Sequence, residues 1–292
     1  MADTVEQQNI RGLDIDKTVK GFALIEYIFK NDCTVSPTSS DAVRWYQETS
    51  ADLEATTPQA IANISPLSIF PNIEPSWTRN TSYPRKYGAE CFISMEDIKT
   101  ADIDVLARSL LRLTRAVVKQ VDTRIWNVLT ENQSPSNINS FATTAVGGDQ
   151  WDAASYAGNP IKDLLEAIRL ITTNGYNAVG ASLYLSPTDY RNLLDWLITG
   201  KGSSIPSFSS EKVRTGKVME ILGLNVKVSP NVTADYAAVV VPQVACTWKS
   251  VQDTTSRIIE EPGIGSKIRV WEHGEAILTD PKAVVLITDT QT

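Results

Sequence analysis

The feature that most constrains the fold is the stretch from Asp104 to Leu129, which contains neither Gly nor Pro. Apolar residues recur in it at intervals of three and four, the spacing of one buried helix face. They are Ile103, Leu106, Leu110, Leu113, Val117, Val121, Ile125 and Val128. At about 1.5 Å per residue the predicted helix is roughly 40 Å long, well beyond the usual three or four turns. A helix of this length suits a structural support.

A second face of the same helix is basic, with Arg108, Arg112, Arg115 and Lys119 again spaced by three and four. Such a face either contacts packaged nucleic acid or an acidic neighbouring subunit, or is simply solvated with weak ion pairs. The whole chain has a formal net charge of −7, which argues against general nucleic-acid binding through its overall field. Any attraction to phosphate must therefore come from this local face.

The cysteine pattern and the apolar runs indicate an intracellular protein. Cys33, Cys91 and Cys246 are far apart and odd in number, which predicts reduced, packed thiols and no disulfide framework. The first residues are polar and of mixed charge, unlike a signal peptide, and no stretch approaches eighteen apolar residues. We therefore expect no membrane association.

The order of the predicted elements makes the chain α+β, because the helices and strands do not alternate regularly. Residues 1–40 form an arm whose apolar patch, Phe22 to Phe29, is suited to docking on a neighbour. In residues 41–95, strand-like segments at 43–49 and 87–94 flank a proline-rich stretch with sparse apolar residues. Such a long excursion is typical of an interacting loop.

Beyond the long helix, local signals predict a small helix–strand–helix unit followed by strands. Asn159 and Pro160 are suited to begin a helix and Gly175 to end it. A buried strand follows at 178–186, and Ser186 with Pro187 begins the next helix. The loop at 199–212 is predicted to be flexible, and the remainder is rich in strands.

No pattern in the sequence predicts a catalytic, cofactor-binding or metal site. Lys201 follows a Gly, but the first Gly of a phosphate loop and its preceding strand are missing. His273, the single histidine, lies on a predicted strand next to Gly274, where we expect a turn, and no nucleophile motif accompanies it. Glu260 and Glu261 are adjacent and so face opposite sides of a strand, which favours a solvated turn over paired acid–base chemistry.

Acidic residues at 97–104 lack the Gly and distal Glu of a calcium loop, and they fit the start of a helix.

Four segments, taken in order, resemble one known family. They are 86–129, from a strand through a short S-x-E turn into the long helix; 164–197, with an apolar strand ending in SP-x-x-Y; 216–242, a hairpin with G-x-x-V and a strand; and 276–288, a strand preceded by P-x-A. This order resembles the major capsid proteins of tailed double-stranded DNA viruses, the HK97-fold family. Each motif is loose alone, and their order carries the resemblance across roughly residues 40–290.

The resemblance implies a domain organisation: N-terminal arm 1–40; extended β-hairpin (E-loop) 41–95; spine helix and peripheral domain 96–150; axial domain 151–235; and a return to peripheral strands at 236–292. It implies a structural, non-enzymatic subunit that assembles into hexamers and pentamers around double-stranded DNA. Its location would be the virion capsid, assembled in the host cytoplasm. Expected partners are other copies of the chain, scaffold, portal or decoration proteins, and DNA held by weak, non-specific contacts.

The sequence departs from some members of the family in two respects, the scaffolding segment and the cross-link between subunits. Only some 40 residues precede the E-loop, too few for the long scaffolding segment of some members, so a separate scaffold or none is implied. Some members cross-link a Lys of the E-loop, and Lys86 lies near the hairpin, but nothing marks a partner Asn or a catalytic Glu. An encapsulin-like shell around an enzyme cargo and an α+β hydrolase with a site near His273 remain as alternatives.

Overall fold

The computed structural model describes Val19 and Glu96 and the ranges 27–47, 64–70, 78–94, 105–200 and 220–292. The chain forms two compact units, each described by itself. Unit 1 comprises Met1–Val43, Ser82–Ile125 and Trp248–Ile277, and unit 2 comprises Arg44–Thr81, Trp126–Thr247 and Leu278–Thr292.

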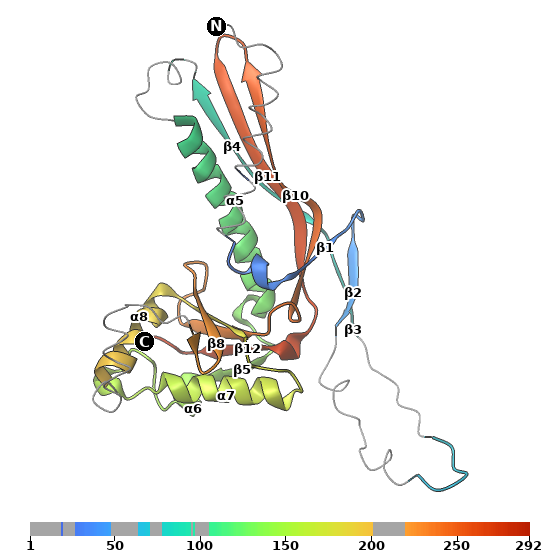
Figure 1. Cartoon of the computed structure of the whole chain (residues 1–292), viewed down its shortest axis with the longest axis vertical. Helices are drawn as coiled ribbons and strands as arrows, with labels where there is room; N and C mark the ends of the chain where they lie inside the picture. Colours follow the sequence, from blue (N-terminus) through green and yellow to red (C-terminus); the bar gives the residue numbers. More distant parts are fainter. Residues whose placement is uncertain are drawn as a thin grey trace. The chain divides into compact units, whose positions relative to one another are not determined.

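Most of unit 1 is one long helix and a four-stranded sheet in the order β1-β10-β11-β4 (Figure 1). Its elements are η1 (Lys30–Asp32), β1 (Thr34–Pro37), β4 (Arg85–Ser94), α5 (Val105–Leu129), β10 (Cys246–Glu261) and β11 (Gly265–Leu278), of which the last three cross the unit boundary at one end. Strands β4 and β11 are antiparallel, with Val270 opposite Ala89 and Glu272 opposite Tyr87.

Helix α5 confirms the predicted long helix and the orientation of its faces. Leu110, Leu113, Val117, Val121 and Ile125 are buried, whereas Val128 is only half-buried. The four basic residues of the second face are exposed.

The core of unit 1 lies between α5 and one face of the sheet. Leu110, Leu113 and Val117 pack with Ile93 of β4 and with Ile268 and Val270 of β11. Because side chains alternate along a strand, the even-numbered residues of β11 from Ile268 to Glu272 share the core face.

Unit 2 is built on a six-stranded mixed sheet in the order β5-β12-β9-β6-β8-β7, with a separate pair, β2-β3. Its strands are β2 (Val43–Gln47), β3 (Thr78–Ser82), β5 (Asn139–Ala142), β6 (Ser182–Leu185), β7 (Glu220–Ile221), β8 (Leu224–Val228), β9 (Tyr236–Val240) and β12 (Val284–Thr288). Its helical segments are η2 (Glu131–Gln133), α6 (Thr143–Val146), η3 (Ala154–Tyr156), α7 (Pro160–Thr173), α8 (Pro187–Asp195), η4 (Trp196–Gly200) and η5 (Pro281–Ala283).

The caps predicted for α7 and α8 are present. The Asn159 side chain accepts a hydrogen bond from the Lys162 N–H, and the Ser186 hydroxyl accepts one from the Asp189 N–H. Gly175, just after α7, has a φ of 86°, the left-handed conformation that glycine adopts without strain. Strand β6 between the two helices is fully buried, as its apolar run predicts.

One prediction about local structure is wrong. His273 does not lie in a turn: it pairs with Lys86 inside β11, and Gly274 continues the strand opposite Arg85. Of the apolar patch Phe22 to Phe29, residues 22–26 lie outside the described residues, and Tyr27 and Phe29 are buried within the chain itself, at 4% and 0% exposure. The predicted loop at 199–212 lies almost entirely outside the described residues.

The three cysteines are free, as predicted, with Cys33 and Cys246 buried. Among the described helices, none is long and apolar enough to cross a membrane.

Candidate functional site: a buried polar network

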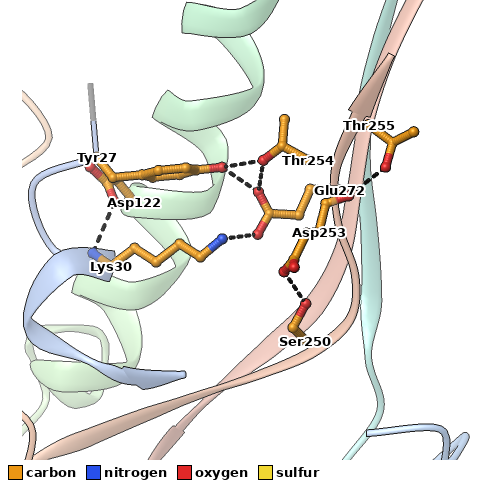
Figure 2. A network of polar contacts seen from close by, with 8 residues as sticks. All are labelled: Tyr27, Lys30, Asp122, Ser250, Asp253, Thr254, Thr255 and Glu272. Atoms are coloured by element: carbon orange, nitrogen blue, oxygen red, sulfur yellow. Dashed lines mark hydrogen bonds and ion pairs between the residues drawn. The ribbon is translucent and has the colours of Figure 1, made fainter. Parts of the chain in front are cut away.

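The carboxylate of Glu272 is the centre of a polar network inside unit 1 (Figure 2). The alternation of β11 turns Glu272 into the core, and the residue is 0% exposed. Lys30 Nζ lies 2.5 Å from one carboxylate oxygen, and the other oxygen accepts hydrogen bonds from the Tyr27 hydroxyl and, at 2.9 Å, from the Thr254 hydroxyl. A buried carboxylate is tolerated only when it is paired and hydrogen-bonded, and these three donors meet that requirement.

A second buried carboxylate, Asp122 of α5, holds the backbone of the same N-terminal segment. It accepts hydrogen bonds from the N–H groups of Ile28 at 2.9 Å and Lys30 at 3.4 Å, at the start of the short helix η1. Burial raises the pKa of Asp122 from its ordinary 3.8 to about 6, although these backbone hydrogen bonds act in the opposite direction. Burial and the neighbouring Glu272 carboxylate likewise raise the pKa of Tyr27.

Lys30 contacts both buried carboxylates: its backbone N–H binds Asp122, and its ammonium pairs with Glu272. Its ammonium lies 4.6 Å from the centre of the Tyr27 ring and 5.5 Å from that of the Trp248 ring, so it is attracted by two aromatic faces as well as by Glu272. The residues Tyr27–Cys33, which we call the clip segment, are thereby fastened to α5, β10 and β11. With its donors and acceptors engaged among themselves and buried, the network is suited to holding segments together.

One further buried carboxylate in unit 1 is paired with arginine. Glu275, 0% exposed, accepts from Arg124 Nε at 2.9 Å and from an Arg124 terminal nitrogen at 2.5 Å. Arg85 Nε approaches the other carboxylate oxygen at 3.7 Å. Arg124 therefore fixes α5 to β11 at a second point.

The structure does not bring the residues considered in the sequence together as a reactive site. Glu260 and Glu261 end β10, and Glu261 forms an ion pair with Lys267 across the hairpin, consistent with a solvated turn. Lys86 lies over the Trp271 ring at 5.6 Å. Lys201 lies outside the described residues, and among those described no group of three or more His, Cys, Asp or Glu is placed to hold a metal ion.

Sequence reasoning missed the network around Tyr27, Lys30, Asp122 and Glu272. A signal was present: Glu272 falls on the same alternation as Ile268 and Val270, and Asp122 interrupts the apolar face next to Val121. A charged residue at a position that its pattern assigns to the core predicts a buried partner. The partners themselves lie too far away in the sequence to be identified from it.

Comparisons with protein families and with solved structures find proteins that form capsids or virus-like particles. Among solved structures, the fold is similar to a virus-like particle protein from Pyrococcus furiosus, with a TM-score of 0.62 and 12% identity over 95% of this chain and 99% of the other. It is similar to the capsid of the cyanophage P-SCSP1u, with a TM-score of 0.65 and 12% identity over 90% of this chain and 88% of the other. A structure from Mycobacterium phage Che8 matches with a TM-score of 0.61 and 14% identity over 91% and 92%.

At these identities the likeness establishes the fold, a mixed α/β architecture shared with phage capsid structures. A comparison with curated protein sequences gives no significant match. The family model described as "Phage capsid protein" matches residues 80–287, which is more than half of the chain and includes α5, the β10–β11 hairpin and most of unit 2. The chain therefore belongs to the phage capsid protein family and is a structural capsid subunit.

Proposed function

We propose that this subunit assembles into hexamers and pentamers that form an icosahedral virion shell around double-stranded DNA. In this proposal α5 is the spine helix, residues 41–95 are the E-loop, and the expected domain ranges apply: arm 1–40, peripheral 96–150 and 236–292, axial 151–235. Its principal partner is a second copy of itself, with scaffold, portal or decoration proteins as further partners. Assembly takes place in the host cytoplasm, and no membrane is involved.

The observation that carries the proposal is the exposed apolar side chains in the described part of residues 41–95. Leu67, Ile69 and Phe70 are 107%, 94% and 79% exposed in the single chain. Scattered exposed apolar residues are ordinary, but three within four positions, beside the turn at Ser65–Ser68, favour a surface that a partner covers. A neighbouring copy satisfies this need in every subunit of a closed shell.

A second candidate is an encapsulin-like compartment that holds an enzyme cargo. The similarity to a virus-like particle protein, in addition to phage capsids, supports this second candidate. The two candidates share a shell and differ in its contents.

Electron microscopy of the purified full-length chain tests the shell, and analysis of nuclease-treated particles tests the contents. We expect closed particles with five-fold and six-fold clusters of subunits, and protected double-stranded DNA in particles taken from infected or induced cells. Particles that protect a stoichiometric protein and no nucleic acid would support the compartment instead. A chain that stays monomeric at high concentration, and in the presence of the other virion proteins, would exclude both.

A further inference from the structure

The clip segment, Tyr27–Cys33, enters the core of unit 1 by placing polar groups on two buried carboxylates. Its backbone N–H groups reach Asp122 of α5, and its Tyr27 and Lys30 side chains reach Glu272 of β11 (Figure 2). The segment lies within the N-terminal arm, residues 1–40. Its seating therefore contributes to the attachment of the arm, together with Val19, which is buried in the core of unit 1.

The charges of this cluster do not balance. Asp122 is 1% exposed and Glu272 is 0% exposed, whereas the one cation among the groups drawn in Figure 2, Lys30, has a side chain that is 11% exposed. Both ionised carboxylates together leave one negative charge in excess inside the protein. Burying an uncompensated charge is costly, and a carboxylate in that position takes up a proton instead.

We propose that seating of the clip segment is coupled to protonation of Asp122, so that the N-terminal arm is held more tightly in mild acid than above neutral pH. Seating takes one proton from solvent onto the Asp122 carboxyl group. Release of the segment removes the cover from Asp122, returns its carboxylate to water and gives the proton back. The coupling belongs to the single subunit and does not depend on the assembly proposed above.

We assign the proton to the carboxyl group of Asp122. The donors to Asp122 among the described residues are backbone N–H groups, whereas the Lys30 ammonium and two hydroxyl groups contact Glu272. The pKa of Asp122, raised to about 6 by burial, agrees with this assignment. Among the described residues, the charged and titratable groups that act on Asp122 are Lys30 and Tyr27 of the clip segment, and Tyr27 also contacts Glu272 of β11.

His273 is the single histidine of the chain, and its position separates it from the cluster. It neighbours Glu272 on β11, so its side chain points to the opposite face of the sheet. Replacing His273 therefore leaves the coupling unchanged and provides a control for it.

The two pKa values set the size of the effect. A carboxylate whose pKa is about 6 when covered and 3.8 when released favours the seated state about tenfold more at pH 5 than at pH 7. Because the seated pKa is the higher one, the gain is complete below pH 3.8 and is lost as the pH rises through 6.

Hydrogen exchange of the full chain, followed by mass spectrometry between pH 5 and pH 8 and corrected for intrinsic exchange rates, measures the seating. We expect the protection of residues 28–33 to rise about tenfold from pH 7 to pH 5, while peptides that span Leu110 to Val117 of α5 provide the reference for the stability of unit 1. Asp122→Asn keeps a side-chain acceptor and cannot ionise, so it should give acid-like protection at every pH. His273→Asn should retain the wild-type profile.

Protection of residues 28–33 in the wild type that does not change with pH, or that falls in acid relative to residues 110–117 of α5, overturns the proposal. So does an Asp122→Asn variant that keeps the wild-type profile, or a His273→Asn variant that loses it. If Asp122→Asn fails to fold, the wild-type titration still decides, because protection of residues 28–33 that does not rise between pH 7 and pH 5 contradicts the proposal.

Discussion

Arg124 on α5 donates two hydrogen bonds to the same carboxylate oxygen of Glu275 on β11, from Nε at 2.9 Å and from a terminal nitrogen at 2.5 Å. Glu275 is fully buried, and its second oxygen has Arg85 at 3.7 Å, whose side chain is 62% exposed. The two arginines thus contact one carboxylate in different environments. Their replacement separates the effect of a buried ion pair from that of an exposed one.

Arg124→Met should lower the free energy of unfolding by about 3–5 kcal/mol, because it leaves the Glu275 charge buried without its main partner. Arg85→Met should cost less than about 1 kcal/mol, since an exposed pair is weakened by solvent. Urea denaturation followed by circular dichroism measures both. Equal losses for the two variants would contradict the assigned roles.

Asp163 of α7 should make unit 2 more stable in mild acid. It is 0% exposed and accepts a hydrogen bond from the Trp151 indole at 2.8 Å. Burial raises its pKa from 3.8 to about 6 against the effect of that hydrogen bond, so the folded state binds the proton more tightly than the unfolded state. This contribution to stability is complete below pH 3.8 and is lost as the pH rises through 6.

Melting temperatures of the wild type and of Asp163→Asn, compared between pH 5 and pH 7.5, test this expectation. The variant should lose stability relative to the wild type at pH 5 and recover part of the difference at pH 7.5. Glu166→Gln on the same helix is the matched control, because the Arg169 hydrogen bond lowers the Glu166 pKa below its ordinary 4.5, so the effect of this substitution is nearly constant between pH 5 and pH 7.5. A difference between wild type and Asp163→Asn that is constant with pH would refute the assignment.

The two faces of α5 should differ sharply in their tolerance of substitution. Leu110 is 2% exposed in the core of unit 1, and Leu110→Ala should destabilise the subunit by about 2–5 kcal/mol. Arg112→Ala, on the exposed face, should change stability by no more than about 0.5 kcal/mol. Thermal melts that show similar losses for both would mean that the helix is oriented differently.

The exposed patch at residues 67–70 should be needed for assembly and not for folding. Ile69→Ser combined with Phe70→Ser should leave the circular dichroism spectrum of the subunit unchanged and prevent the formation of particles. Ser68→Ala, between the same positions, should assemble normally. Particles formed by the double variant at the wild-type yield would show that this patch does not bind a neighbour.

The isolated subunit should bind double-stranded DNA weakly and without sequence preference. The basic residues of α5 are exposed, but the chain carries a formal net charge of −7, and screening limits their reach to about 8 Å at physiological salt. We expect dissociation constants of about 10⁻⁴–10⁻⁶ M or weaker at about 0.15 M salt, measured by fluorescence anisotropy. A submicromolar value would indicate a dedicated nucleic-acid-binding surface.

Helices α5, α7 and α8 could be predicted from the sequence because their signals are local. The apolar spacing of α5 and the side-chain caps at Asn159 and Ser186 lie within a few residues of the structure that they specify. By contrast, Tyr27 and Glu272 are separated by 245 positions, and Ile28 and Asp122 by 94. No local pattern specifies such pairs, so the network becomes visible only when the fold is known.

The prediction of a turn at His273 was wrong for a related reason: a packing requirement that is distant in the sequence. Gly274 lies in the middle of β11, where Trp248 and Lys249 approach so closely that a Cβ atom would lie 2.6 Å from the Trp248 ring and 2.7 Å from the Lys249 carbonyl oxygen. The glycine is required by packing between strands and not by a reversal of the chain. In a sequence, a glycine that favours a turn cannot be distinguished from a glycine that is required by close packing against a distant residue.

The division of unit 1 into three chain segments has a consequence for its synthesis. Helix α5 belongs to the second segment, and the strands that cover its apolar face with Ile268 and Val270 belong to the third, which begins at Trp248. At 5–20 residues per second, the ribosome takes on the order of ten seconds to pass from one to the other. During that interval Ile93 of β4 has already been made, but β11 has not, so the part of the α5 apolar face that β11 covers is exposed and is a surface that a chaperone would meet.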